Sequence, residues 1–207
     1  MRYEEYIREF SELFLKEAVI EPEDFPNVEL YADQAAQFIS DKLGIYGKDP
    51  LLTKSMIANY VKNDLLPSPE GRKYDKSQLV MMELILCLKT TFQMNDIKAI
   101  MKPFVENYES EFEDKIDFVK IYETFLPDFK EQRKKIADGI LADMENIKER
   151  YRDLEPDADD ATELFLLFMS ISMKVDTAMY IGKNLLRTYF ETDEKVEKAQ
   201  KKAKKKK

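Results

Sequence analysis

The sequence contains no histidine, and this absence excludes several kinds of chemistry. Ser-His and Cys-His nucleophile pairs depend on histidine, and so do metal sites with imidazole ligands. The single Cys87 cannot form an intrachain disulfide, and it lies in an apolar run where a small buried side chain is expected. The sequence also has no glycine-rich phosphate loop and no cluster of metal ligands. We therefore predict that the protein is not an enzyme and needs no metal or other cofactor.

Glycine is scarce as well, with five residues in 207, and tryptophan is absent. Hydrophobic residues make up 44% of the chain, which is enough to build a packed core. Most of the remaining residues are long side chains such as Lys and Glu, which lose little freedom in a helix. The composition therefore predicts a mostly helical protein with one helical domain or two small ones.

The sequence shows no pattern of a leader or of a membrane anchor. The first twenty residues are acidic and amphipathic, whereas a leader has a basic region followed by an apolar one. The longest apolar stretch, residues 164–173, is shorter than the about 20 residues that a spanning helix needs. We therefore expect a cytoplasmic protein that makes no membrane contact.

The net charge of -8 is distributed unevenly along the chain. Residues 48–102 hold nine Lys or Arg against six Asp or Glu, and residues 195–207 hold eight Lys against one Glu. The other residues are strongly acidic. One part of the molecule can therefore approach phosphate while the rest keeps it soluble, although a surplus of three cations is also common on solvated helices.

Residues 52–69 have the pattern of an amphipathic helix followed by a break. Thr53 is suited to cap the helix, because its hydroxyl can accept a backbone hydrogen bond. At about 100° per residue, one arc of the helix is apolar and the opposite arc is polar. The apolar arc consists of Met56, Ile57, Tyr60 and Val61, and the polar arc of Lys54, Ser55, Ala58, Asn59 and Lys62. Cations for phosphate beside small polar groups for base edges are what DNA reading requires.

Further elements are predicted on both sides of this helix. A supporting helix over residues 30–43 precedes it, and Gly71-Arg72-Lys73-Tyr74 follows it as a short wing. The nearly all-apolar sequence of residues 76–89 predicts a helix at the centre of the core. Another helix is expected to begin at an Asn95 cap and to end at Pro103.

This order of helix, helix, wing, helix and helix resembles the DNA-binding head of MerR-type winged-helix regulators. The landmarks of the resemblance are Tyr60, Leu65-Leu66, Pro67 and Tyr74. Residues 28–103 more closely resemble an uncharacterised bacterial domain family built on the same core. Its pattern is matched by Leu30-Tyr-Ala-Asp-Gln34, by residues 52–62, by Leu65-Leu-Pro-Ser-Pro69 and by Arg72-Lys-Tyr-Asp75. The resemblance implies a DNA-binding fold, and no reaction or ligand is known for the family as a whole.

The predicted DNA-binding set combines the polar arc of the helix with the wing. Its members are Thr53, Lys54, Ser55, Asn59, Lys62, Arg72, Lys73 and Tyr74. The cations are expected to hold phosphates, while Ser55 and Asn59 are expected to read base edges. Ala58 stands where MerR-type regulators usually carry an arginine. We therefore expect modest specificity at each half-site and a homodimer that compensates for it.

Each member of the set also has a simpler interpretation in which it serves only the fold. Lys54 and Lys62 are typical of a solvated helix face, and Asn59 can satisfy a neighbouring backbone group. Tyr74 is most simply a core residue. Thr53 is a cap under either interpretation, and its loss would destabilise the helix by ~1 kcal/mol without proving anything about DNA.

The rest of the chain is predicted to be helical outside its tail. Residues 3–18 form an amphipathic helix, and the stripe from Phe118 ends at Pro127. An amphipathic helix over residues 128–154 then packs in a bundle, and a last helix follows Pro156. That last helix is more apolar than one buried face requires. Its excess indicates a bundle centre, a dimer interface or a small-molecule pocket, in that order.

The fold class predicted from the sequence is all-α, with a MerR-like winged helix-turn-helix, a small β wing and a C-terminal helical bundle. The predicted domains are an N-terminal helix and linker (1–27), the winged helix-turn-helix (28–103), a helical bundle for dimerisation or an effector (104–192) and a disordered Lys-rich tail (193–207). The predicted function is that of a sequence-specific transcriptional regulator that binds double-stranded DNA. The alternative is a protein-interaction module that kept the scaffold and lost its affinity for DNA.

Overall fold

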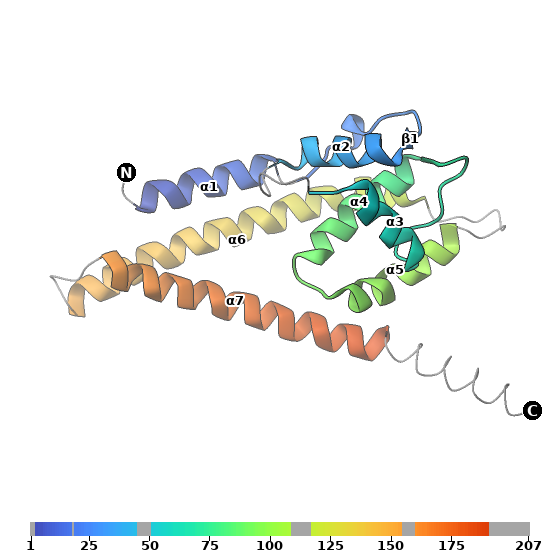
Figure 1. Cartoon of the computed structure of the whole chain (residues 1–207). Coiled ribbons are helices and arrows are strands. Elements are labelled where there is room, and N and C mark those ends of the chain that lie inside the picture. The colour runs from blue at the N-terminus through green and yellow to red at the C-terminus, as the bar shows by residue number, and fades with distance from the viewer. Residues whose placement is uncertain (1–2, 18, 45–50, 109–116, 155–159, 191–207) are drawn as a thin grey trace, which may run out of the picture. The chain divides into compact units, whose positions relative to one another are not determined.

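The structure is a computed structural model that describes residues 3–17, 19–44, 51–108, 117–154 and 160–190. Within these residues the chain forms seven α-helices, one short 3-10 helix and one two-stranded sheet (Figure 1). A mostly helical protein with a small β element is therefore confirmed. The predicted Lys-rich tail lies outside the described residues.

The chain divides into two compact units. The described residues within 17–124 and 182–190 form one, called here the head unit, and those within 3–16 and 125–181 form the other, called here the bundle unit. The division between the two units falls inside α6 (Phe118–Leu154), so the first turns of that helix belong to the head unit. The domain boundary predicted after residue 103 stays a prediction.

Helix α4 (Lys76–Lys89) is the most buried helix of the head unit. Asp75 caps its start, because its carboxylate accepts a hydrogen bond from the Gln78 backbone N–H at 2.8 Å. Its neighbours include α2 (Ala32–Lys42) and α5 (Met94–Tyr108) (Figure 1). Its fully buried apolar side chains are Leu79, Val80, Met81, Met82 and Ile85. A helix covered on most sides needs apolar residues all round, as its sequence indicated.

The small sheet joins the start of the head unit to its wing. Strand β1 (Leu30–Tyr31) pairs antiparallel with β2 (Lys73–Tyr74), with Leu30 opposite Tyr74. Leu30 and Tyr31 were expected to begin the supporting helix, and this prediction is wrong because α2 starts only at Ala32. No local signal marks strand β1 in the sequence, because its pairing partner lies more than forty residues along the chain.

Two prolines that were expected to end helices lie inside them. Pro103 is within α5, which continues to Tyr108, and Pro127 is within α6. A proline in a helix interior lacks one backbone hydrogen bond and is costly on its own. Buried neighbours on the same helices, Met101 near Pro103 and Leu126 beside Pro127, hold the backbone helical by packing. The Asn95 cap is also wrong, because α5 begins one residue earlier at Met94.

The bundle unit contains α1 (Tyr3–Glu17), most of α6 and most of α7 (Asp160–Tyr189). Arg8 of α1 donates to Glu145 of α6 at 2.7 Å. Lys174 of α7 contacts Asp143 of α6 at 2.6 Å. The three helices therefore pack together through polar contacts as well as apolar ones. The sequence predicted α1 to reach Ala18, which lies outside the described residues.

Much of the apolar surface of α7 stays exposed. Phe165, Phe168 and Met173 expose 60%, 66% and 64% of their surface. Among the described residues, one helix, α7, is long and apolar enough to cross a membrane, although its apolar stretch was predicted to be too short. A single such helix is weak evidence of a membrane segment. The Lys174–Asp143 ion pair places charge in the middle of α7, directly after the apolar stretch of residues 164–173.

Candidate nucleic-acid interface

Helix α3 (Lys54–Lys62) has well-defined ends. The Thr53 hydroxyl accepts a hydrogen bond from the Met56 backbone N–H at 3.2 Å, so the predicted N-cap is confirmed. At the other end Asp64 adopts a left-handed conformation with φ of 58°. The Leu65 N–H then reaches the Tyr60 carbonyl at 2.9 Å, which closes the helix in a Schellman motif. A short helix fixed at both ends is a rigid platform for side chains.

The apolar arc of α3 faces the core of the head unit, as its periodicity predicted. Ile57 and Tyr60 are almost fully buried. Ser40 of α2 ties the start of α3 to the supporting helix, because its hydroxyl donates to the Leu52 carbonyl at 3.3 Å and accepts from the Leu52 N–H at 3.2 Å. The opposite arc is thereby turned outward.

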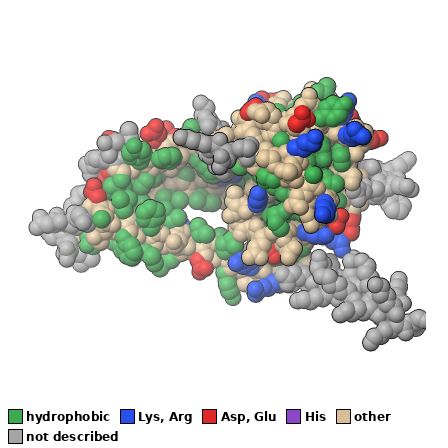
Figure 2. Space-filling view, in the orientation of Figure 1, with side chains coloured by type: hydrophobic (Ala, Val, Ile, Leu, Met, Phe, Trp, Pro, Cys, Tyr) green, Lys and Arg blue, Asp and Glu red, His purple; other side chains and the backbone are tan. Residues whose placement is uncertain are grey.

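The polar arc of α3 is exposed along its whole length. Its exposed residues are Lys54, Ser55, Ala58, Asn59 and Lys62, to which Asn63 adds one more polar group. Within the described part of the chain neither lysine of α3 stands in an ion pair, so both positive charges are available to an anion. Figure 2 shows further Lys and Arg side chains on the head unit.

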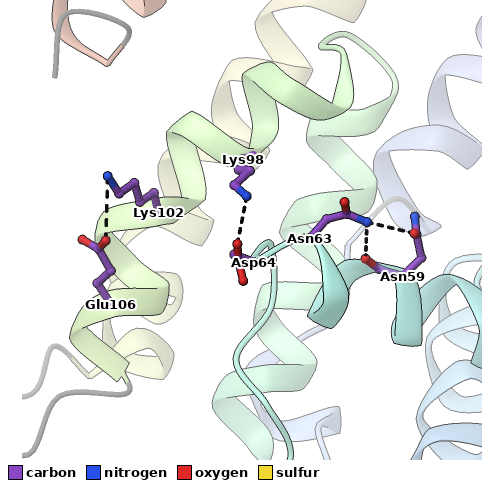
Figure 3. A network of polar contacts seen from close by, with 6 residues as sticks. All are labelled: Asn59, Asn63, Asp64, Lys98, Lys102 and Glu106. Carbon is purple, nitrogen blue, oxygen red and sulfur yellow. Dashed lines mark hydrogen bonds and ion pairs between the residues drawn. The ribbon is translucent and has the colours of Figure 1, made fainter. Parts of the chain in front are cut away.

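The exposed amides of α3 form a local network beside α5 (Figure 3). The Asn63 amide nitrogen donates to the Asn59 side-chain oxygen at 2.9 Å and to the Asn59 backbone carbonyl at 2.8 Å. Next to it, Lys98 of α5 pairs with Asp64 at 2.9 Å. Asn63 was not among the predicted site residues, although its spacing of four residues from Asn59 is a sequence signal that places the two side chains side by side on a helix.

The wing is a tight turn held between Glu70 and Lys73. The Lys73 N–H donates to the Glu70 carbonyl at 2.9 Å, while Gly71 and Arg72 have φ of 53° and 69°. Two successive left-handed residues are typical of a type I′ hairpin turn. Arg72 is therefore exposed at the tip. The ammonium group of Lys73 lies 5.4 Å from the ring centre of Tyr31, a cation–π contact that holds it near the turn.

Tyr74 must be removed from the predicted DNA-binding set. Only 4% of its surface is exposed, and burial raises the pKa of its hydroxyl above the ordinary value. It packs in the core because strand β2 turns alternate side chains inward and outward. Its role is structural, as the simpler interpretation of the sequence had it.

Gln78 anchors the segment that connects α3 to the wing. It is 1% exposed, and its side-chain nitrogen donates to the carbonyls of Pro67 at 3.2 Å and Ser68 at 3.1 Å. Its side-chain oxygen accepts from the Asp75 N–H at 2.9 Å. Gln78 was not among the residues predicted from the sequence. The spacing of Asp75 and Gln78 is that of a capping box, which would have indicated part of its role.

A second feature lies in the bundle unit, between α6 and α7. It is an open groove of about 950 Å³, lined mainly by Ile147, Tyr151, Leu166, Met169, Met173 and Ile181. The Asp143 carboxylate lies in its wall, where hydrogen bonds from Lys174 and Ser170 lower its pKa below the ordinary value. Among the described residues no group of three or more His, Cys, Asp or Glu side chains is arranged to hold a metal ion.

Comparison with known proteins identifies one family. The family model described as Domain of unknown function (DUF1836) matches residues 20–125, just over half of the chain. The match covers α2 to α5, both strands and the first turns of α6, and so includes the whole α3 and wing surface. No curated protein matches the chain, and no solved structure matches it.

Proposed function

We propose that this chain, which belongs to the family described as Domain of unknown function (DUF1836), is a sequence-specific DNA-binding transcriptional regulator of MerR-like type. One observation carries the proposal. A short helix capped at both ends exposes Lys54 and Lys62 outside any ion pair with a described residue, beside a tight turn that exposes Arg72.

The roles follow from the chemistry of the exposed groups. Lys54, Lys62 and Arg72 supply positive charge for backbone phosphates, which fixes the position of a protein on the duplex. Lys73 adds a further cation at the base of the turn. An α-helix fits the major groove of B-form DNA, where a polar side chain such as Asn59 can reach base edges.

The local charge must act against the charge of the whole chain. The net charge is -8 and the sequence pI is about 4.9, so the protein as a whole is repelled by DNA. Added salt screens exposed charges over about 10 Å at 0.1 M, so binding depends on cations that touch the duplex. A charge reversal on α3 should therefore have a large effect.

The test is a charge reversal with a matched control. We expect duplex DNA to retain the wild-type protein at low salt. The variant Lys54→Glu/Lys62→Glu should not be retained. The control Lys120→Glu/Lys134→Glu makes the same charge change at exposed positions of α6 and should keep DNA binding. Circular dichroism should show that both variants melt close to the wild type, because all four side chains are solvated. If duplex DNA does not retain the wild-type protein even at low salt, the proposed regulator function is refuted.

A second candidate function is that of a protein-interaction module without DNA binding. The observation that favours it is the apolar surface of α7, where Phe165, Phe168 and Met173 are exposed. Exposed apolar patches of this kind mark interaction surfaces in soluble proteins. Complexes formed through such a surface should persist as salt rises, whereas DNA binding through phosphate contacts should weaken steeply.

We also propose that the bundle unit carries the further partners of the regulator. The exposed apolar residues of α7 supply a surface for a homodimer, which would join two heads on a DNA site with two halves. The groove between α6 and α7 has the volume and apolar lining of sites that take small molecules, and so supplies room for an effector.

A further inference from the structure

The contact between Asn59 and Asn63 decides which atoms α3 presents to a ligand (Figure 3). One atom of the Asn63 amide lies 2.8 Å from the Asn59 backbone carbonyl, which can only accept, so this atom is the nitrogen. The same nitrogen lies 2.9 Å from a side-chain atom of Asn59, which must then be the oxygen. The Asn59 amide nitrogen is therefore left on the other side with two N–H donors.

Ser55, the other predicted reader, is already engaged. Its hydroxyl lies 3.0 Å from the Thr53 hydroxyl that caps the helix. A hydroxyl held in the cap is less able to turn toward a base edge. Among the two residues predicted to read bases, Asn59 therefore carries most of the discrimination.

Donor geometry favours one kind of base edge. Guanine presents two acceptors in the major groove, N7 and O6, whereas adenine presents one acceptor and one donor. An asparagine that reads adenine must accept and donate with the same amide edge, and the hydrogen bond from Asn63 turns the Asn59 oxygen toward Asn63. We propose that Asn63 is a positioning residue that holds the Asn59 amide with its nitrogen outward, so that Asn59 reads mainly as a donor and the protein prefers guanine at one position. This inference rests on the proposed DNA binding.

A merely structural role for Asn63 makes a different prediction. Asn63 is also the C-cap of α3, and its backbone N–H donates to the Asn59 carbonyl at 3.1 Å. A side chain that served only the helix end would change stability when removed. It would not change which base is preferred.

The experiment is a selection of bound sequences from a random duplex library at low salt. The proteins are the full chain and its variants Asn59→Ala, Asn63→Ala and Asn63→Asp. The control Asn95→Asp adds the same charge at an exposed position of α5. We expect the wild type and the control to enrich guanine at one position. Asn59→Ala should lose that preference, and Asn63→Ala should lower the guanine to adenine ratio by about fivefold or more.

Asn63→Asp gives the sharpest prediction, because a carboxylate accepts and cannot donate. The Asn59 amide should then turn its nitrogen toward the aspartate and its oxygen outward. Preference should move from guanine to a base that offers a donor, cytosine or adenine. The added charge weakens binding to all sequences alike, so the base ratio remains the readout.

The outcomes separate the inference from the function on which it rests. If no variant and no wild-type protein binds any duplex, the proposed function fails and the inference fails with it. If the wild type binds and Asn63→Ala keeps the same guanine preference, the inference is overturned while the regulator stands. Enrichment of adenine at the position read by Asn59 in the wild type would overturn the inference as well.

Discussion

Tyr122 shows how a single hydroxyl can join distant parts of the head unit. It lies 2.7 Å from the Ile20 carbonyl and 3.0 Å from a carboxylate oxygen of Glu83, and Glu83 also accepts from the Ile20 N–H at 3.1 Å. Tyr122 and Glu83 are 2% and 1% exposed. Burial, followed by the nearby Glu83 carboxylate, raises the pKa of Tyr122 above its ordinary value. The neutral hydroxyl is therefore the form that the fold requires.

Replacement of Tyr122 by phenylalanine should destabilise the head unit. The ring remains, but the one hydroxyl hydrogen shared by two buried acceptors, the Ile20 carbonyl and the Glu83 carboxylate, is lost, so the free energy of unfolding should fall by about 1–3 kcal/mol at neutral pH. The wild type should also lose stability as the pH rises above 10, because tyrosine ionises there only when unfolded. Urea titrations followed by circular dichroism at several pH values measure both effects. Coincident curves for the wild type and Tyr122→Phe would contradict this role.

The left-handed backbone conformation of Gly71 in the wing turn can be tested by a single substitution. Its φ is 53°, and an added Cβ would meet nothing within 4 Å. The cost of Gly71→Ala is therefore one of backbone conformation alone, about 1–2 kcal/mol. Gly44→Ala is the control, since Gly44 is equally uncrowded and lacks a left-handed φ. Thermal unfolding should show a lower melting temperature for Gly71→Ala only, and equal losses in both would argue against the turn.

At the scale of elements, α6 carries a proline that it would be more stable without. Pro127 is exposed in the interior of a 37-residue helix. Pro127→Ala restores a backbone donor and should raise the free energy of unfolding by up to about 3 kcal/mol. Pro22→Ala is the control, because Pro22 begins a 3-10 helix, where proline is favoured. If the helix is instead broken at Pro127 in solution, Pro127→Ala should gain neither stability nor helix content, which would contradict a continuous α6.

The elements that sequence predicts well are those with local signals. The cap and apolar arc of α3 follow from Thr53 and the spacing of its apolar residues, and the burial of α4 follows from its unbroken apolar run. Pro103 and Pro127 mislead because packing by distant residues overrides a local preference. Strand β1 is missed because its partner lies far along the chain.

The candidate site was predictable in part for the same reason. Helical periodicity places Lys54, Asn59 and Lys62 on the exposed arc, where the structure has them. Periodicity does not report that Tyr74 turns inward at the sheet or that Gln78 holds the segment before the wing. Which amide atom Asn59 presents depends on side-chain contacts that no sequence pattern specifies.

At the scale of the whole molecule, the bundle unit leaves several large apolar side chains of α7 exposed. If α7 forms a dimer interface, Phe165→Ser/Phe168→Ser should shift the protein toward a monomer in analytical ultracentrifugation with little change in stability, since both side chains are solvated. Leu167→Ala on the same helix is the contrast. Leu167 is 4% exposed, so its loss should cost about 2–5 kcal/mol of stability. If the wild-type protein sediments as a monomer at all concentrations, the proposed dimer interface on α7 is contradicted.

The most direct test of DNA binding by the α3 and wing surface is the salt dependence of its affinity for a labelled duplex. Four cations, Lys54, Lys62, Arg72 and Lys73, should each neutralise one phosphate. For one bound head the slope of log affinity against log salt should then be about -3 to -4, so that affinity falls roughly 100-fold between about 50 and 200 mM salt, and the slope should be about twice as steep where a homodimer places both heads on the duplex. An affinity that is absent at the lowest salt, or that stays constant across this range, would contradict the assignment of this surface to DNA.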